Sequence, residues 1–275
     1  MTYDSIEVQP LTPHIGATIG GINLARPLRE KAHREIHDAL MRHQVLFFHD
    51  QKITIDEHLA LGRQFGDLHV HPGSPPPEGY PEILVVHADA NSTKISGEQW
   101  HSDVSCDEQP PMGSILNLHT VPETGGDTIF ASMYSAYDAL SEPMKVFLSH
   151  LTATHDGEQV YRGRYADRGV NDTGKTYPKA VHPVVRTHPV TGRKAVYVNS
   201  YFTTRINELT QAESQTLLRY LSQHATQPAF QCRFKWQANS IAFWDNRCVQ
   251  HIAMWDYYPQ VRSGFRVTIK GERPV

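Results

Sequence analysis

Two histidines and one aspartate have the residue types and the spacing of a metal site. His101 and Asp103 lie two positions apart in Gln99–Val104, which reads as a short extended segment. In a strand, side chains at i and i+2 point to the same face, so these two would converge on one point. His251, far downstream, supplies a further imidazole. Two nitrogens and one carboxylate oxygen on one side of a metal, with open positions opposite, are typical of non-haem Fe(II) oxygenases.

Two arginines near the end of the chain match the needs of such an oxygenase. Of the three free metal positions, 2-oxoglutarate can chelate two and leave the third for water and then O2. Its far carboxylate needs a cation, and Arg262 is placed to supply one through the planar fork of its guanidinium. Arg266 shares that face if the last strand is regular, which suggests that the substrate is a small organic anion as well. A surface ion pair is the alternative for either arginine.

The composition is that of an ordinary globular protein. The chain has 275 residues, of which 39% are hydrophobic and 20% charged. No repeat, low-complexity tract or linker divides it, so we expect a single domain over residues 1–275. The formal net charge of -3 and the lack of any Lys/Arg run argue against a nucleic-acid partner.

Nothing in the sequence indicates secretion or a membrane partner. The N-terminus has no basic start followed by an apolar run, and no apolar segment approaches the roughly 20 residues needed to span a bilayer. Cys106, Cys232 and Cys248 are too few and too scattered for a disulfide framework. We therefore expect a cytoplasmic protein. A homo-oligomer is compatible with the sequence.

Hydrophobic patterns predict two helices and a strand in the first part of the chain. Apolar residues recur every four positions from Leu28 to Leu40, which predicts a helix. Thr54 has the character of an N-cap for a second helix over residues 55–65. Between the two helices, the apolar run Val45–Phe48 predicts a short buried strand.

From residue 82 the pattern changes to short strands separated by turns. Helices are predicted at Ala136–Leu148 and Thr210–His224. Many short strands without alternating helices indicate a mainly β fold with flanking helices and a double-stranded β-helix (jelly-roll) core. Irregular stretches at 72–81 and at about 156–179 are expected to be lids. The predicted strands are Glu82–His87, Trp100–Val104, Ser114–His119, Lys194–Asn199, Phe230–Trp236, Ser240–Trp244 and Phe265–Lys270.

An ordered set of motifs runs through nearly the whole chain. After the H-x-D of residues 101–103 come Thr128 about two dozen positions later, then His251, and then Arg262 after about ten more. Further stretches that support the match are Gly125–Thr128, Phe202–Ile206 and Trp244–Arg247, and similarity begins at Leu11–Ala17. In this order the motifs resemble the TauD/TfdA family of Fe(II)/2-oxoglutarate-dependent dioxygenases, most closely its taurine dioxygenase members. H-x-D alone is common, whereas the ordered set is specific.

The resemblance implies a role for each matching residue. His101, Asp103 and His251 would bind Fe(II), while Thr128 and Arg262 would hold the far carboxylate of 2-oxoglutarate, with O2 as the other cosubstrate. The expected reaction hydroxylates the carbon next to the anionic group of taurine or a related sulfonate, and it releases sulfite and an aldehyde with succinate and CO2. The alternatives are the same chemistry on alkyl sulfates or aryloxyalkanoic acids, and more remotely a zinc hydrolase or a non-catalytic jelly-roll binding module.

The chain departs from the family pattern around the substrate. His71 and Arg266 match the positions that bind a sulfonate, but Ser74 and Cys106 stand where taurine dioxygenase has aromatic residues, and Gly97 replaces an asparagine. Two lost rings predict a wider, less apolar pocket for a bulkier acid. The alternative is that Tyr161 or Tyr165 of the second irregular stretch refills the space. The candidate substrate-binding residues are His71, Ser74, Gly97, Cys106, Phe202 and Arg266.

Overall fold

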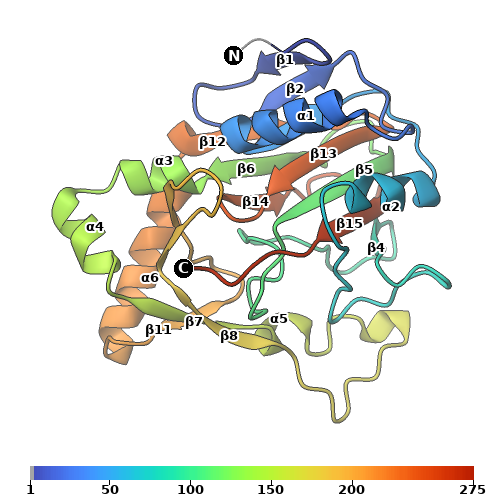
Figure 1. Ribbon diagram of the computed structural model, residues 1–275. Coiled ribbons are helices and arrows are strands. Elements are labelled where there is room, and N and C mark those ends of the chain that lie inside the picture. The colour runs from blue at the N-terminus through green and yellow to red at the C-terminus, as the bar shows by residue number, and fades with distance from the viewer. Residues whose placement is uncertain (1–2) are drawn as a thin grey trace.

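The computed structural model describes residues 3–275, and it is mainly β-sheet with helices on the outside, as predicted (Figure 1). The helices are α1 (Glu30–His43), α2 (Ile55–Arg63), α3 (Met133–Asp138), α4 (Glu142–Leu148), α5 (Glu158–Tyr161) and α6 (Gln211–Ala225), with 3-10 turns at Ala166–Arg168 and Pro228–Phe230. The strands are β1 (Glu7–Pro10), β2 (Ala17–Gly20), β3 (Val45–Phe48), β4 (Leu84–Ala88), β5 (Gly113–Thr120), β6 (Thr128–Ser132), β7 (Thr152–Asp156), β8 (Lys179–Pro183), β9 (Val185–Thr187), β10 (Lys194–Val196), β11 (Thr203–Ile206), β12 (Gln231–Phe234), β13 (Ser240–Asp245), β14 (Val249–Ala253) and β15 (Arg262–Ile269).

Seven strands form the main sheet, in the order β1-β2-β3-β13-β5-β15-β4. Strands β2 and β3 pair in parallel, and the other neighbours in this sheet are antiparallel. Every residue of β3 and of β13 is buried, because both faces of the sheet are covered at these strands. A strand covered on both faces reads as a continuous apolar run, which is why the sequence pattern located β3 correctly.

A smaller antiparallel sheet, β12-β6-β14, packs on one face of the main sheet. The two sheets meet in an aromatic cluster, in which Phe47 of β3 stacks on Phe234 of β12 with ring centroids 4.0 Å apart. Phe130 of β6 meets the same Phe47 ring edge-on at 5.5 Å. Two sheets packed face to face around an apolar centre form the predicted jelly-roll core.

Helices α1 and α2 cover the opposite face of the main sheet (Figure 1). Side chains alternate along a strand, so Leu46 and Phe48 of β3 point toward these helices while Phe47 points into the core. Ile36 and Leu40 of α1 lie in the same cluster as Leu46 and Phe48. Among the described residues, no helix has the length and apolar character needed to cross a bilayer.

The remaining strands carry the loops that surround the site. Strands β11, β7 and β8 form a three-stranded antiparallel sheet, and β9 pairs with β10. The chain leaves β7 into α5 and a loop that reaches across to residues 94–98. There Lys94 donates to the Gly163 carbonyl at 3.5 Å and Arg164 donates to the Ile95 carbonyl. The second irregular stretch therefore lies over a segment far from it in the sequence.

Capping boxes precede two of the helices, and the first lies at the N-cap predicted for Thr54. The Thr54 hydroxyl accepts the Glu57 N–H at 3.2 Å, and the Glu57 carboxylate accepts the Thr54 N–H at 2.7 Å, which is a complete capping box before α2. Before α6, the Glu213 carboxylate accepts the Thr210 N–H at 2.9 Å. Helix α2 begins at the predicted Ile55, and α6 begins at Gln211, one residue after the predicted Thr210.

Two predictions of regular structure are wrong. The helix expected over Ala136–Leu148 is divided into α3 and α4, because Pro143 lacks an N–H and tolerates only the first turn of a helix. The strand expected over Trp100–Val104 is absent. Only His101 makes a β-bridge there, with His251, and the chain then turns, so that Val104 has a φ of 46°.

Truncating the core ring of Phe47 tests whether the contact between the two sheets stabilises the fold. Phe47→Ala should lower the free energy of unfolding by about 3–5 kcal/mol, as expected for a fully buried phenylalanine. Phe147→Ala is the matched control, because Phe147 is 44% exposed and should change stability by less than about 0.5 kcal/mol. Urea unfolding of both variants measures the difference. Equal losses would contradict the packing described here.

Candidate active site

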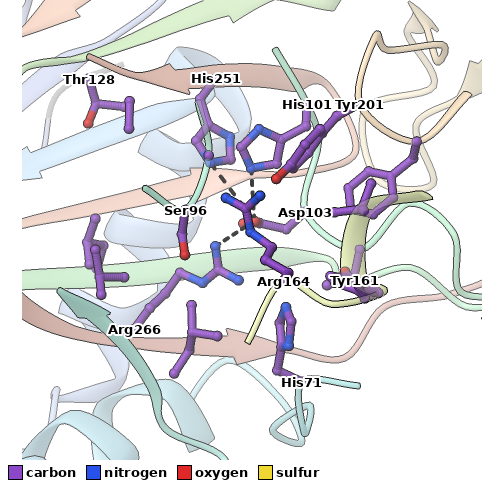
Figure 2. Close-up of a pocket in the computed structure, with 18 of the residues that line it drawn as sticks. His71, Ser96, His101, Asp103, Thr128, Tyr161, Arg164, Tyr201, His251 and Arg266 are labelled. Atoms are coloured by element: carbon purple, nitrogen blue, oxygen red, sulfur yellow. Dashed lines mark hydrogen bonds and ion pairs between the residues drawn. The ribbon is translucent and has the colours of Figure 1, made fainter. Parts of the chain in front are cut away.

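His101, Asp103 and His251 come together in one buried cluster (Figure 2). The Nε2 atoms of His101 and His251 lie 3.6 and 3.9 Å from Oδ1 of Asp103. One ligand atom from each of the three side chains lies within 4.8 Å of the other two. The predicted convergence is therefore present, although it arises from a bridge and a turn rather than from a strand.

Backbone and side-chain contacts orient the two imidazoles. His101 and His251 exchange two backbone hydrogen bonds, at 3.1 and 2.8 Å. Nδ1 of His101 lies 2.7 Å from the Gln99 carbonyl, which directs Nε2 toward the cluster. Burial, together with the nearby charges of His101 and Arg266, holds the pKa of His251 well below its ordinary value. The His251 ring is therefore neutral and able to bind a metal.

Asp103 is held by the Trp244–Arg247 motif and by β5. The Asn246 side-chain carbonyl accepts the Asp103 N–H at 3.2 Å and the Trp244 indole N–H at 2.9 Å. The Asn246 amide donates to Ser114, and the Ser114 hydroxyl donates to Oδ2 of Asp103 at 2.7 Å. The Oδ2 atom of the carboxylate is thus fixed, and Oδ1 faces the imidazoles.

Arg266 balances the buried charge of Asp103. Its Nη1 lies 2.5 Å from Oδ1 of Asp103, and both side chains are at least 90% buried. Burial disfavours the ionised carboxylate, but the charge of Arg266, together with the hydrogen bond from His101, outweighs it and holds the pKa of Asp103 well below its ordinary value. Asp103 is therefore ionised at neutral pH.

Thr128 and Arg262 meet at the start of β6 and β15. The Arg262 Nε–H donates to the Gly126 carbonyl at 2.9 Å, and its Nη2 lies 3.3 Å from the Thr128 hydroxyl oxygen. Trp236 donates its indole N–H to the same hydroxyl at 2.9 Å and stacks on the Arg262 guanidinium at 5.6 Å. Burial lowers the pKa of Arg262 to about 10, so it remains charged at neutral pH. This pair can hold a carboxylate.

His71 is a neutral hydrogen-bond donor toward the cavity. Burial, followed by the charges of Arg266 and His69, lowers the pKa of His71 to about 3. Its Nδ1 accepts the Gly73 N–H at 3.1 Å and the Ser74 N–H at 2.9 Å. Because Nδ1 is an acceptor in both bonds, the hydrogen-bond network assigns the ring proton to Nε2.

A single cavity unites these residues. It holds about 690 Å³ of space, part of which is open to solvent. Arg262 and Arg266 both line it. The pairing of β15 with β4 is continuous from one to the other, so their side chains, four positions apart, point to the same face of the strand. Gly97 also lines it, and a Cβ there would come within 3.1 Å of the His101 ring. The other predicted residues on its wall are His71, His101, Asp103, Thr128, Phe202 and His251.

Ser74 and Cys106 do not line the cavity. Ser74 is buried and acts on the site through its backbone N–H. Cys106 lies in a cluster behind the wall together with Tyr161. Tyr161 and Tyr165 do line the cavity, reaching it from the second irregular stretch, which is the arrangement that the alternative prediction requires.

Small residues make the slot that Tyr161 occupies. A Cβ on Gly73 would lie 3.1 Å from the Tyr161 ring, and a Cβ on Gly157 would lie 3.0 Å from the Cys106 sulfur and 3.1 Å from the Tyr161 ring. The ring edge of Tyr161 meets His71 with centroids 5.1 Å apart. The small side chain at Cys106 thus allows a loop tyrosine to pack beside the candidate anion site.

Sequence reasoning missed Arg164 and Tyr201, which both line the cavity (Figure 2). The Arg164 guanidinium lies over the Tyr201 ring at 5.7 Å, and the Tyr201 ring meets His101 edge-on at 5.3 Å. Burial raises the pKa of Tyr201 to about 12, so its hydroxyl remains protonated. The only sequence signal for Arg164 was its place in an arginine-rich irregular stretch, and Tyr201 had none.

The donor set at the cluster fits a divalent metal. Two imidazole nitrogens and an ionised carboxylate converge from one side, and the cavity lies on the other. A second buried group, His188, Asp245 and Cys248, does not fit one as well. Both carboxylate oxygens of Asp245 already accept hydrogen bonds from Arg247, at 2.7 and 2.8 Å, so this group is a buried ion pair.

Comparison with known proteins agrees with this geometry. The family model described as "Taurine catabolism dioxygenase TauD, TfdA family" matches residues 7–268. An alpha-ketoglutarate-dependent sulfonate dioxygenase of Saccharomyces cerevisiae is 35% identical over 98% of this chain and 68% of its own. An alpha-ketoglutarate-dependent sulfate ester dioxygenase of Pseudomonas putida is 34% identical over 98% of this chain and 91% of its own.

Solved structures agree as well. A taurine dioxygenase from Burkholderia xenovorans superimposes with a TM-score of 0.86 and 35% identity, over 99% of this chain and 93% of that one. The fold and the enzyme class predicted from the sequence are confirmed, and Fe(II), 2-oxoglutarate and O2 are the cofactor and cosubstrates of that class. The chain belongs to the TauD/TfdA family of 2-oxoglutarate-dependent dioxygenases.

Proposed function

We propose that this dioxygenase hydroxylates the carbon next to the anionic group of a small organosulfonate, taurine or a related acid. The hydroxylated carbon collapses to an aldehyde and sulfite, while 2-oxoglutarate and O2 are consumed and succinate and CO2 are released. The observation that carries the proposal is the position of Arg266 and His71 in the same cavity as the metal cluster. The names of the yeast and Pseudomonas relatives support a sulfonate or sulfate ester as the anion.

Three side chains would hold the iron. His101 and His251 contribute imidazole nitrogens, and Asp103 contributes an ionised oxygen fixed by Ser114. Iron, when bound, supplies the activation of O2 and of the substrate C–H bond. The task of the protein is then to place one carbon of the substrate beside the open positions and to exclude water, since positioning accounts for a large part of catalysis.

Two different cations would hold the two acids. Arg262 stays charged, and its Nε–H is already bound to the Gly126 carbonyl, so its outer N–H groups can pair with the far carboxylate of 2-oxoglutarate. The Thr128 hydroxyl accepts from Trp236 and can donate its own proton to the same carboxylate. The substrate anion would bind to the Arg266 guanidinium and accept a hydrogen bond from the Nε2–H of His71.

We also propose that residues 1–275 act as one catalytic domain in the cytoplasm. Candidate site residues from His71 to Arg266, all but Ser74 and Cys106, line one cavity, which supports a single unit. Cys106, Cys232 and Cys248 are free, buried thiols, in keeping with a reducing compartment. A zinc hydrolase and a non-catalytic binding module have no support among the dioxygenase relatives.

A panel of acids tests the substrate class. Anaerobically iron-loaded protein is mixed with 2-oxoglutarate, O2 and taurine, longer alkanesulfonates, alkyl sulfates or aryloxyacetates, and succinate, sulfite and aldehyde are measured. We expect an alkanesulfonate to release succinate, sulfite and aldehyde in equal amounts. Turnover of alkyl sulfates alone, with sulfate released in place of sulfite, would make the chain a sulfate ester dioxygenase. Turnover of aryloxyacetates alone would refute the proposal that the substrate contains sulfur.

Removal of the carboxylate at Asp103 tests the metal site. Asp103→Ala should abolish substrate-dependent succinate release and weaken Mn(II) binding by at least about 10–100-fold, the loss typical even of groups that only orient a metal ligand. Equilibrium dialysis with Mn(II) measures the affinity directly. Asp156→Asn, which removes a carboxylate outside the cavity, should leave the affinity unchanged. Full Mn(II) affinity in Asp103→Ala would exclude it as a ligand.

The two arginines are distinguished by their effects on the two KM values. Arg262→Gln should raise the KM for 2-oxoglutarate by about 10–100-fold, because a hydrogen bond to a charged group contributes about 1.5–3 kcal/mol. Arg266→Gln should raise the KM for the sulfonate by a similar factor while changing that for 2-oxoglutarate little. Steady-state kinetics with each acid varied in turn measures both. The reverse pattern would mean that the two assignments are exchanged.

A further inference from the structure

The cavity wall carries a third arginine to which neither of the two proposed acids has been assigned. Three arginines line it, namely Arg164, Arg262 and Arg266, and the last two are each matched to one acid above. Among the described residues on its wall, Asp103 is the only carboxylate, and it is a proposed iron ligand. A substrate that carried an ammonium group would therefore meet a third cation and no free carboxylate.

Arg164 is held firmly at the wall. Its side chain is 11% exposed, and its Nη1 pairs with Glu98 at 3.3 Å while its Nη2 donates to the Ile95 carbonyl. These contacts use two of the five N–H groups of a guanidinium. Glu98 itself does not line the cavity, so it anchors Arg164 from behind without offering an anion to the substrate. The charge is thus fixed in place, with donors left for a ligand.

Tyr201 adds an unpaired donor beside this charge. Its hydroxyl is buried and has no hydrogen-bond partner among the described residues. In Figure 2, Tyr201 lies on the side of the metal cluster, His71 on the opposite side of the view and Arg164 between them. A buried hydroxyl is normally paired, so an unpaired one at a cavity wall is most simply explained by a ligand that it binds.

We propose that Arg164 and Tyr201 bind a second hydrogen-bond acceptor on the substrate, separate from the sulfonate held by Arg266 and His71. This rests on the proposed function and deepens it. The preferred substrate is then an organosulfonate that carries a carboxylate or a hydroxyl on its other end, and not the ammonium of taurine. A carboxylate satisfies both donors, because a guanidinium fork and a hydroxyl can each reach one of its oxygens.

A matched series with a constant sulfonate tests the proposal. The kcat/KM for succinate release is measured with 3-sulfopropanoate, 2-hydroxyethanesulfonate, propane-1-sulfonate and taurine. Calorimetry under nitrogen, with Mn(II) and 2-oxoglutarate bound, gives the dissociation constants independently of turnover. We expect 3-sulfopropanoate to exceed propane-1-sulfonate by about tenfold or more, as a charge-assisted hydrogen bond predicts, and taurine to be the poorest.

Variants assign the preference to these two residues. Arg164→Gln should remove the advantage of 3-sulfopropanoate over propane-1-sulfonate and leave the KM for 2-oxoglutarate unchanged, and Tyr201→Phe should reduce the advantage while keeping the ring against His101. Arg168→Gln is the control, since Arg168 lies on the same loop but not on the cavity wall, and it should retain the full preference.

The outcomes separate this inference from the proposed function. Taurine as the best sulfonate would overturn the inference and leave the sulfonate dioxygenase standing. An equal loss for all four sulfonates in Arg164→Gln would also overturn it, because Arg164 would then bind the sulfonate or merely hold the loop. Succinate release with none of the sulfonates, but with another class of acid, would refute the proposed function itself.

Discussion

The candidate metal site depends on one pairing of backbone groups. His101 and His251 are far apart in the sequence, yet each donates its N–H to the carbonyl of the other, at 3.1 and 2.8 Å. His251 lies on β14, which is fixed by its pairing with β6, whereas His101 lies on an irregular segment with no other bridge. The jelly-roll core therefore positions one imidazole directly and the other through this bridge. His101 is thereby held in place as firmly as a residue of a strand, although it lies on a loop.

The second requirement is to keep a carboxylate ionised in a buried place. An isolated buried charge is strongly unfavourable, so Asp103 needs both hydrogen bonds and an opposite charge. Asn246 and Ser114 provide the hydrogen bonds, and Arg266 provides the charge. This explains why the Trp244–Arg247 motif belongs with the ligand motif, although its residues are distant from it in the sequence. Asn246 of this motif holds Asp103 through its backbone N–H and through Ser114.

The sequence was sufficient for the residues that sit on regular strands and insufficient for those on loops. The prediction that Arg262 and Arg266 share a face held, because β15 pairs with β4 without a shift of register. His101 and Asp103 do converge, but the expected strand is absent, so the reason given for their convergence was wrong. The alternation of side chains along a strand cannot describe a turn. The path of the chain through this turn depends on residues such as Val104, whose φ is in the left-handed region.

The wall of the cavity shows why substrate preference is harder to predict than chemistry. Cys106, which the sequence analysis matched to an aromatic position of the family pattern, does not line the cavity. Its small side chain, together with Gly73 and Gly157, leaves room for Tyr161 to enter from a loop more than fifty positions away. The size of a buried residue behind the wall thus bears on which side chain forms the wall. The jelly-roll core determines where the ligands of the metal lie. The packing between this core and the second irregular stretch determines what shape of acid can approach them.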